Sequence, residues 1–126
     1  MKITYSKIAI VGQGGMGRAY KVTDKSGAPK VVKTTVIPDD SHMKAEYYLL
    51  AHFRHPNLAC VFKSFYVHGS LAIEMEWYTG GDLSAALYRD RIPETTMAPI
   101  FCDVLCGLRH IHQKPQIFFL TMEADL

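Results

Sequence analysis

Three glycines with the spacing Gly12-x-Gly14-x-x-Gly17 lie between β-rich segments near the start of the chain, and no helix-length segment separates the strands around them. The expected strands in this part are residues 5–11, 18–23 and 30–36. Strands this close together favour an antiparallel meander, because a parallel pair needs a long crossover connection. Glycine has no Cβ and accepts positive φ, so its backbone can approach a phosphate closely. The run therefore predicts an antiparallel sheet whose first hairpin can lie over a phosphorylated ligand.

The remainder of the chain extends this sheet and then becomes helical. Asp39, Asp40 and Ser41 supply N-cap side chains for a helix over about residues 42–53. Two further strands are expected over residues 59–68 and 71–77, around a turn at Gly69-Ser70, and a helical segment over residues 94–113. Apolar residues at helical spacing form one stripe in that segment: Ile100, Val104, Leu108 and Ile111. The sequence predicts an α+β chain with five antiparallel strands and one helix, followed by a helical part.

The same glycine spacing also matches the dinucleotide-binding fingerprint, and Asp39 stands about twenty residues further on. That fingerprint requires a helix to begin within the glycine motif, so that the helix N-terminus faces the pyrophosphate. Strand-type sequence follows Gly17 instead, which disfavours a dinucleotide site.

A lysine and a glutamate follow the glycine run at positions where they can meet. Lys33 lies in the Val-rich third strand, so its apolar stem can pack while its ammonium reaches a phosphate. Glu46 lies in the following helix and can pair with that lysine. Each residue alone is most simply a solvated surface charge. A glycine loop, a strand lysine and a helix glutamate in this order form a recognisable set.

This set resembles the protein kinase family, in which the glycine loop covers the ATP phosphates, the lysine contacts them and the glutamate holds the lysine. The resemblance continues through His55-Pro56-Asn57 and through residues 71–83. It implies that Met75 is the gatekeeper and that the backbones of Glu76 and Tyr78 bind adenine. The ATP-binding residues that it implies are Gly12, Gly14, Gly17, Ala19, Val31, Lys33, Glu46, Met75, Glu76, Tyr78 and Asp82.

Three short segments resemble the NIMA-related serine/threonine kinases most: Met75-Glu76-Trp77, Gly80-Gly81-Asp82-Leu83 and Phe119-Leu120-Thr121. The resemblance implies a protein-kinase-like fold with a small lobe over residues 1–75, a hinge over residues 76–81 and a partial large lobe over residues 82–126. A chain of 126 residues would then hold one complete small lobe and only the first part of a large lobe.

Two positions depart from the usual adenine slot of kinases. Val is usual two residues after the third glycine and Ala two residues before the lysine, and the two sandwich the adenine. This chain has Ala19 and Val31 at those positions. Exchanging a larger and a smaller side chain across one slot conserves its volume. We therefore expect an adenine site of nearly normal width.

The catalytic loop of the family is missing. After His112-Gln113-Lys114 the sequence continues with Pro115-Gln116-Ile117, without the His-Arg-Asp motif, and Ile117 takes the place of an Mg²⁺-binding Asn. The chain ends at Leu126, where the Asp-Phe-Gly motif would begin. Asp82 and Asp103 are carboxylates, but neither is expected near a transferred phosphate. No catalytic residue and no metal ligand is therefore assigned, and we expect ATP binding with doubtful Mg²⁺ binding and phosphotransfer that is lost or impaired.

Two alternatives to a nucleotide-binding kinase homologue remain: a non-catalytic pseudokinase scaffold that binds a protein partner, and a non-functional kinase fragment. The stripe of Ile100, Val104, Leu108 and Ile111 would be exposed without the later helices of a large lobe, so it is the expected surface for a partner or for self-association. Cys102, Cys106 and His110 lie on one helical face, but a line of ligands suits a tetrahedral metal poorly. We expect Cys102 and Cys106 to be small buried thiols.

Composition adds mainly exclusions. Lys and Arg number 14 against 12 Asp and Glu, and the net charge of +2 is too small to indicate nucleic acid or an anionic membrane as a partner. No apolar run approaches the length that crosses a bilayer, and the first ten residues lack the apolar stretch of a signal peptide. Three cysteines are too few for a disulfide framework, so a cytoplasmic or other intracellular location is expected.

Overall fold

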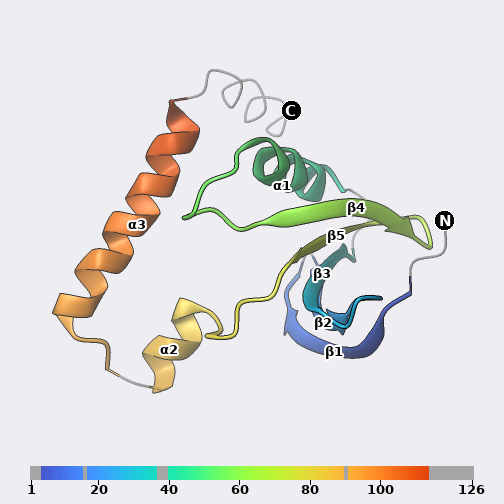
Figure 1. The fold of residues 1–126 in the computed structure, drawn as a ribbon, viewed down its shortest axis with the longest axis horizontal. Helices are drawn as coiled ribbons and strands as arrows, with labels where there is room; N and C mark the ends of the chain where they lie inside the picture. Colours follow the sequence, from blue (N-terminus) through green and yellow to red (C-terminus); the bar gives the residue numbers. More distant parts are fainter. Residues whose placement is uncertain (1–3, 16, 37–39, 90, 114–126) are drawn as a thin grey trace.

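A computed structural model describes residues 4–15, 17–36, 40–89 and 91–113 (Figure 1). Five strands, all paired antiparallel, form one sheet in the order β1-β2-β3-β5-β4. The helix α1 packs on the sheet, and α2 and α3 follow it. The bounds are β1 Ser6–Gln13, β2 Gly17–Thr23, β3 Pro29–Thr35, α1 Ser41–His52, β4 Val61–Val67, β5 Ser70–Glu76, α2 Leu83–Arg89 and α3 Glu94–His112. The α+β fold that the sequence predicted is confirmed, and β2 after the glycines confirms that no helix begins there.

Two tight turns fix the strand pairing. His68 (φ 49°) and Gly69 (φ 81°) both have positive φ between the paired residues Val67 and Ser70, as a two-residue type I′ hairpin turn requires. The predicted turn at Gly69-Ser70 was therefore one residue too late, because Ser70 already begins β5. In the β2–β3 turn, Asp24 Oδ1 accepts hydrogen bonds from the Ser26 and Ala28 N–H groups, each at 2.9 Å.

The Asp24 carboxylate is also a charged group with a shifted pKa. The Ser26 hydroxyl donates to it at 2.7 Å and Lys30 Nζ lies 3.2 Å away. The pKa of Asp24 is lowered to about 2, most by the hydrogen bonds that its carboxylate accepts from Ser26 and from the Ala28 N–H, and less by the hydrogen bond and charge of Lys30. This turn is therefore held in part by an ionised side chain.

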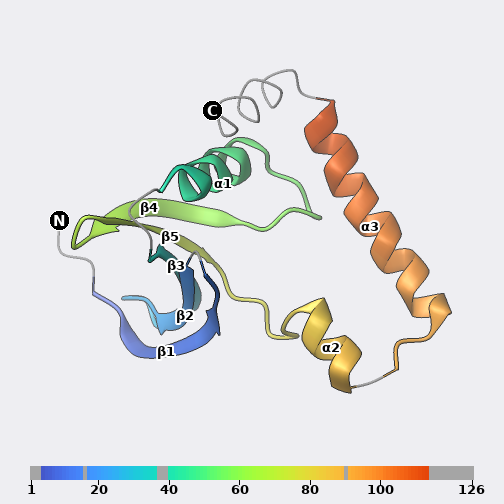
Figure 2. The same ribbon diagram turned by 180° about the vertical axis from the view of Figure 1, so that it is seen from behind.

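The sheet has an apolar cluster on each face because side chains alternate along every strand. On the face under α1, the buried strand residues Val61, Ile73 and Met75 pack with the buried Leu50 of α1. The other face holds the buried residues Val22, Val32 and Ala72, with Tyr5, Tyr20 and Phe65 packed against them. Figures 1 and 2 show α1 on one side of the sheet only. Both clusters lie within the five-stranded part, which is therefore the packed core of the described chain.

A buried carboxylate lies beside the second cluster. Glu74 on β5 is 6% exposed, and it accepts a hydrogen bond from the Tyr5 hydroxyl. Lys63 Nζ lies 3.7 Å from the same carboxylate oxygen. Burial, the bond to Glu74 and the negative charge of Glu74 together raise the pKa of the Tyr5 hydroxyl well above its usual value. The buried carboxylate thus has one partner just before β1, Tyr5, and one on the neighbouring strand β4, Lys63.

The helices α2 and α3 lie away from the sheet, and the two opposite views agree on this (Figures 1 and 2). The seven-residue α2 was not predicted from the sequence. In α3 the buried residues are Gly107 and Ile111, both in its C-terminal part. Ile111 packs with Phe53, which follows α1. The prediction that Ile111 belongs to an exposed face was therefore wrong: that end of α3 packs on the loop after α1.

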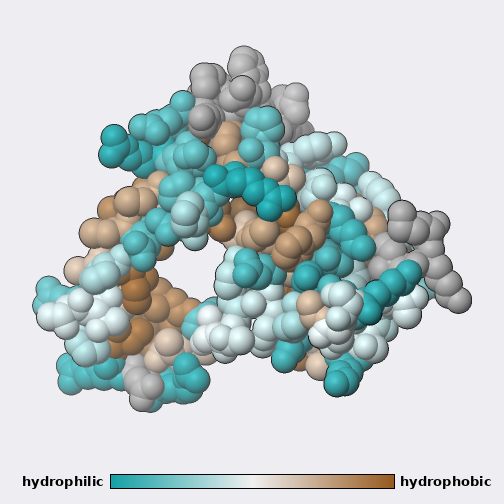
Figure 3. All heavy atoms as spheres, in the orientation of Figure 1, coloured by the Kyte–Doolittle hydropathy of each residue, from teal (hydrophilic) through white to brown (hydrophobic). Residues whose placement is uncertain are grey.

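The rest of the apolar stripe on α3 is more open to solvent. Val104 is 51% exposed and Leu108 is 42% exposed, whereas Ile100 is half-buried. Figure 3 shows open space between α2–α3 and the sheet, with hydrophobic atoms along the side of the two helices that faces it.

Cys102 and Cys106 are exposed rather than buried, because they lie on the part of α3 that no other described element covers. All three cysteines are free thiols. No cluster of metal-ligating side chains occurs within the described ranges. None of the helices in the part of the chain that the structure describes is both long and apolar enough to cross a membrane.

Candidate functional site

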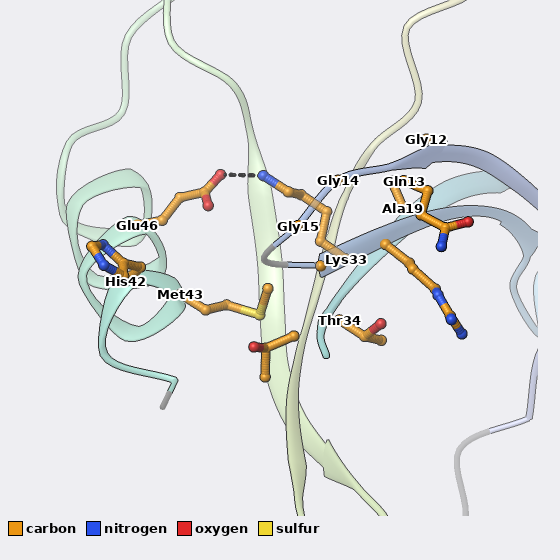
Figure 4. A pocket seen from close by; sticks show the side chains of 13 residues that line it. Gly12, Gln13, Gly14, Gly15, Ala19, Lys33, Thr34, His42, Met43 and Glu46 are labelled. Atoms are coloured by element: carbon orange, nitrogen blue, oxygen red, sulfur yellow. Dashed lines mark hydrogen bonds and ion pairs between the residues drawn. The ribbon is translucent and has the colours of Figure 1, made fainter. Parts of the chain in front are cut away.

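The centre of the candidate site is an ion pair between the sheet and α1. Lys33 Nζ donates to Glu46 Oε1 at 2.7 Å (Figure 4). Lys33 lies opposite Ala19 on β2 and opposite Ile73 on β5, so its side chain stands on the face of the sheet that α1 covers. Glu46 lies near the middle of α1 and points toward it (Figure 4). The structure thus confirms the predicted pairing of these two residues.

Solvent reaches this pair, because both side chains are 36% exposed. An ion pair open to water contributes only about 0–1 kcal/mol to stability. Its main effect is therefore on position: Glu46 holds the lysine ammonium at one place above the sheet. An ammonium fixed in this way is available to an anionic ligand at low entropic cost.

The glycines of the β1–β2 hairpin serve different purposes. A Cβ on Gly17 would lie 2.4 Å from the backbone oxygen of Thr34, so β2 and β3 approach too closely there for any side chain. A Cβ on Gly14 or Gly15 would meet no atom within 4 Å. The N–H of Gly14 donates to the Gly17 carbonyl at 2.9 Å and closes the hairpin. Gly17 is thus required by strand packing, whereas Gly14 and Gly15 leave open space beside the loop.

A cavity of about 490 Å³ lies between the glycine hairpin, β3 and α1. Its volume falls in the range of small-molecule sites. Figure 4 shows Lys33 and Glu46 meeting across it, with Gly14 and Gly15 at its edge. The residues that line it are Gly12, Gln13, Gly14, Gly15, Gly17, Arg18, Ala19, Lys33, Thr34, Thr35, His42, Met43 and Glu46.

Six of the predicted ligand-binding residues therefore come together around one cavity: Gly12, Gly14, Gly17, Ala19, Lys33 and Glu46. The sequence did not single out His42 and Met43, which also line it. They lie four and three residues before Glu46 and so share its face of α1, and this helical spacing is the signal that would have found them.

The other five predicted residues do not line this cavity: Val31, Met75, Glu76, Tyr78 and Asp82. Met75 is 8% exposed and pairs with Val31 under α1. The Glu76 N–H donates to the Cys60 carbonyl at 2.9 Å, and the Tyr78 hydroxyl accepts from the Cys60 N–H at 3.1 Å. These residues follow the sheet toward the segment that joins β5 to α2.

Asp82 has a local structural role. Its carboxylate accepts a hydrogen bond from the Ala85 N–H at 2.7 Å, just where α2 begins at Leu83. This is the interaction of a helix N-cap residue, which satisfies an N–H group of the first turn. The residue that the resemblance assigned to ATP binding thus caps a helix in this structure.

Ala19 and Val31 do not face one another across a slot, and the predicted sandwich was wrong. Ala19 pairs with Lys33, and Val31 lies two residues before Lys33 on the same strand. Residues two apart on a strand point to the same face, so the two side chains are diagonal neighbours on the face under α1. The smaller Ala19 and the larger Val31 therefore reshape the same face of the sheet. The side chain is smaller next to Gly12 and larger next to Met75.

A five-stranded antiparallel sheet with one helix, joined by a lysine–glutamate pair beside a glycine hairpin, defines a protein kinase small lobe. Comparison with known families agrees, since the family described as "Protein kinase domain" matches residues 5–120. The chain therefore belongs to the protein kinase family.

Three curated proteins similar to this chain are kinases of the Nek type, in agreement with the prediction from the short motifs. The chain is 35% identical over 112 residues to the mouse (Mus musculus) serine/threonine-protein kinase Nek5, covering 85% of this chain and 18% of that protein. It is 34% identical over 119 residues to human (Homo sapiens) serine/threonine-protein kinase Nek5, covering 87% of this chain and 17% of that protein. It is 32% identical over 117 residues to mouse serine/threonine-protein kinase Nek3, covering 87% of this chain and 23% of that protein. The chain thus spans about a fifth of the length of the curated relatives that it matches.

Proposed function

We propose that this chain binds ATP through the glycine hairpin and Lys33, and that phosphotransfer is lost or impaired. The observation that carries the proposal is the Lys33–Glu46 pair at 2.7 Å on the wall of a cavity whose rim is glycine backbone. Backbone N–H groups and a fixed ammonium are the groups that bind phosphate oxygens. Gly12, Gly14 and Gly17 would lie over the phosphates. Val31, Met75, Glu76 and Tyr78 would form the adenine side, as the family resemblance implies.

The lining of the cavity fits a triphosphate better than it fits a metal ion. Mg²⁺ prefers carboxylate oxygens together with substrate phosphates. Among the described residues that line the cavity, Glu46 is the one carboxylate, and it is already paired with Lys33. We therefore assign no Mg²⁺ ligand, and the site takes the nucleotide with or without metal.

The sequence also lacks the group that accepts the substrate proton in this family. From His112 to Ile117 there is no Asp and no His-Arg-Asp motif, and these positions would carry the catalytic base. Asp103 lies on the exposed part of α3, away from the Lys33 cavity. Without a base and a metal site, most of the stabilisation of the transferred phosphoryl group is absent.

Calorimetric titration of the full chain with ATP, with and without Mg²⁺, tests the proposal. We expect binding that Lys33→Met weakens about tenfold or more, because a charge-assisted contact to phosphate is lost. Lys25→Met is the matched control: it removes the same charge from an exposed turn and should leave the affinity unchanged. Equal effects of the two substitutions, or no ATP binding by a chain with a cooperative unfolding transition, would refute the site. A phosphotransfer assay on a generic protein substrate should give no product.

A pseudokinase scaffold is the second candidate function, and the exposed apolar surface of α2 and α3 supports it. Seven large hydrophobic side chains on these helices are at least 41% exposed: Leu83, Leu87, Tyr88, Phe101, Val104, Leu105 and Leu108. Apolar surface of this extent favours a protein partner or self-association. Sedimentation velocity at several concentrations should show association that a Val104→Gln, Leu105→Gln double variant reduces. Tyr66→Ser, an exposed position on β4, is the control.

The alternatives separate cleanly in these two experiments. A chain that neither binds ATP nor associates is the non-functional fragment of the third alternative. An ATP site together with three free thiols suits an intracellular location, which is part of this proposal. The division into a small lobe up to residue 75, a hinge over 76–81 and a partial large lobe is part of the same proposal.

A further inference from the structure

Two histidines from distant parts of the sequence lie against one another where α3 meets the small lobe. His55 is in the loop after α1, and His110 is in the last turn of α3. Their ring centroids are 4.8 Å apart and the rings are tilted by 34°. Both side chains are half-buried. We call this pair the histidine clasp.

The clasp belongs to a small junction that holds the C-terminal end of α3. The rings of His110 and Phe53 are nearly perpendicular, with centroids 6.3 Å apart and an interplanar angle of 87°. Phe53 is 3% exposed and packs with Ile111, which is 7% exposed. A Cβ on Gly107 would lie 3.0 Å from the backbone oxygen of Asn57, so the helix and the loop are in close contact.

The hydrogen bonding of the loop fixes the protonation of one ring. The Asn57 N–H donates to His55 Nδ1 at 3.0 Å. A ring nitrogen that accepts a hydrogen bond carries no proton, so His55 is neutral in this arrangement, with its proton on Nε2. Protonation of Nδ1 would remove the acceptor and leave the Asn57 N–H without its partner. The loop conformation is thus linked to the charge of His55.

The charged groups around the clasp do not compensate a second positive charge. From α1 the neighbouring titratable group is His52, whose ring lies 4.9 Å from Phe53. From the loop it is Arg54, which donates to Cys60 Sγ and to the Val61 carbonyl. Beside His110 on α3 stand the basic residues Arg109 and His112. Within the described ranges, no carboxylate pairs with either ring of the clasp.

We propose that the histidine clasp is a proton-sensitive attachment that releases the C-terminal end of α3 when both rings are charged. Imidazole gains its charge between about pH 8 and pH 5. Protons from solvent that charge both rings, one of them at His55 Nδ1, break the bond from Asn57 and place two cations within 4.8 Å of one another. The repulsion opens the contact while the sheet and α1 stay folded.

Hydrogen exchange of single amides by NMR on the full chain, corrected for the intrinsic pH dependence of exchange, tests this proposal. Between pH 7.5 and pH 5.5 the protection of the Asn57 amide and of the last turn of α3 should fall about tenfold, as repulsion between two close charges predicts. The amides of β3 and β5 should not lose protection. His110→Tyr keeps an aromatic ring that does not gain charge in this range, so the protection of the last turn of α3 in this variant should change less than about twofold between the two pH values.

Two further variants keep the test decisive. His112→Gln removes an exposed histidine two residues away and should behave as the original chain does. His55→Asn keeps an acceptor near the Nδ1 position but cannot gain charge, so it should abolish the pH effect even if His110→Tyr proves unstable. An unchanged loss of protection in His55→Asn, or an original chain whose Asn57 amide is equally protected at both pH values, would overturn the proposal.

Discussion

Replacing Gly17 by alanine should destabilise the sheet, whereas the same change at Gly14 should not. A Cβ on Gly17 would lie 2.4 Å from the Thr34 backbone oxygen, and real Cβ atoms do not come closer than 3.0 Å to another heavy atom. The strands β2 and β3 must therefore separate locally by at least about 0.6 Å. The obstructing atom belongs to the backbone, so no side-chain rotation relieves the contact. Forced repacking of this kind costs about 1–3 kcal/mol.

Gly14→Ala is the matched variant, because it makes the same chemical change in the same hairpin. Its Cβ would meet no atom within 4 Å, and the φ of Gly14 is outside the left-handed region. Alanine there is compatible with the fold and restricts the unfolded chain, which stabilises by about 0.4–1 kcal/mol. Urea denaturation of the two variants and the original chain should thus give free energies of unfolding that change in opposite directions. Equal changes in the two variants would refute the argument from the close approach of β2 and β3.

Three further predictions concern stability and pH, each measured by urea denaturation. Tyr5→Phe should cost about 1–3 kcal/mol near neutral pH, because it removes a hydrogen bond to the buried Glu74 carboxylate. Because folding raises the pKa of Tyr5, its hydroxyl contributes fully to the free energy of unfolding below about pH 10, and this contribution falls as the pH rises further. The original chain should therefore lose more stability than Tyr5→Phe between pH 9 and pH 11. The lowered pKa of Asp24 gives the opposite pH dependence. Its carboxylate contributes to the free energy of unfolding above about pH 4, and this contribution is lost as the pH falls toward 2. Asp24→Asn should therefore reduce the loss of stability at acid pH. Phe53→Ala should cost about 3–5 kcal/mol and should expose Ile111, seen as faster amide exchange at the end of α3; unchanged exchange there would contradict the packing.

The sheet was predictable because short strands, turn residues and β-branched side chains are local signals. The pairing of Lys33 with Glu46 was also predictable, since the family resemblance relates residues that are distant in sequence. The relation between Ala19 and Val31 was not, because it depends on strand register: only the pairing of residue 19 with residue 33 shows that both side chains share a face. Spacing along the chain does not contain that information.

The helices show a second limit of sequence reasoning. Apolar periodicity identified α3, but periodicity does not say which part of an apolar stripe finds a partner, so Ile111 was expected at the surface although it packs on Phe53. The short α2 has little periodic pattern of its own. Its best signal was the side chain of Asp82 as an N-cap, and the same residue was instead assigned to the nucleotide.

The attachment of α3 through a few side chains has a consequence for how strong that attachment must be. At its other end α3 is joined through α2 and a short connection to β5 in the same chain, so an opened junction recloses within one molecule. Short connections of this kind give effective concentrations of the order of millimolar. Contacts that two separate proteins would make only at millimolar affinity therefore suffice to keep the helix docked for much of the time. Single substitutions at the junction should accordingly change the docked fraction gradually, in proportion to their effect on that intramolecular equilibrium.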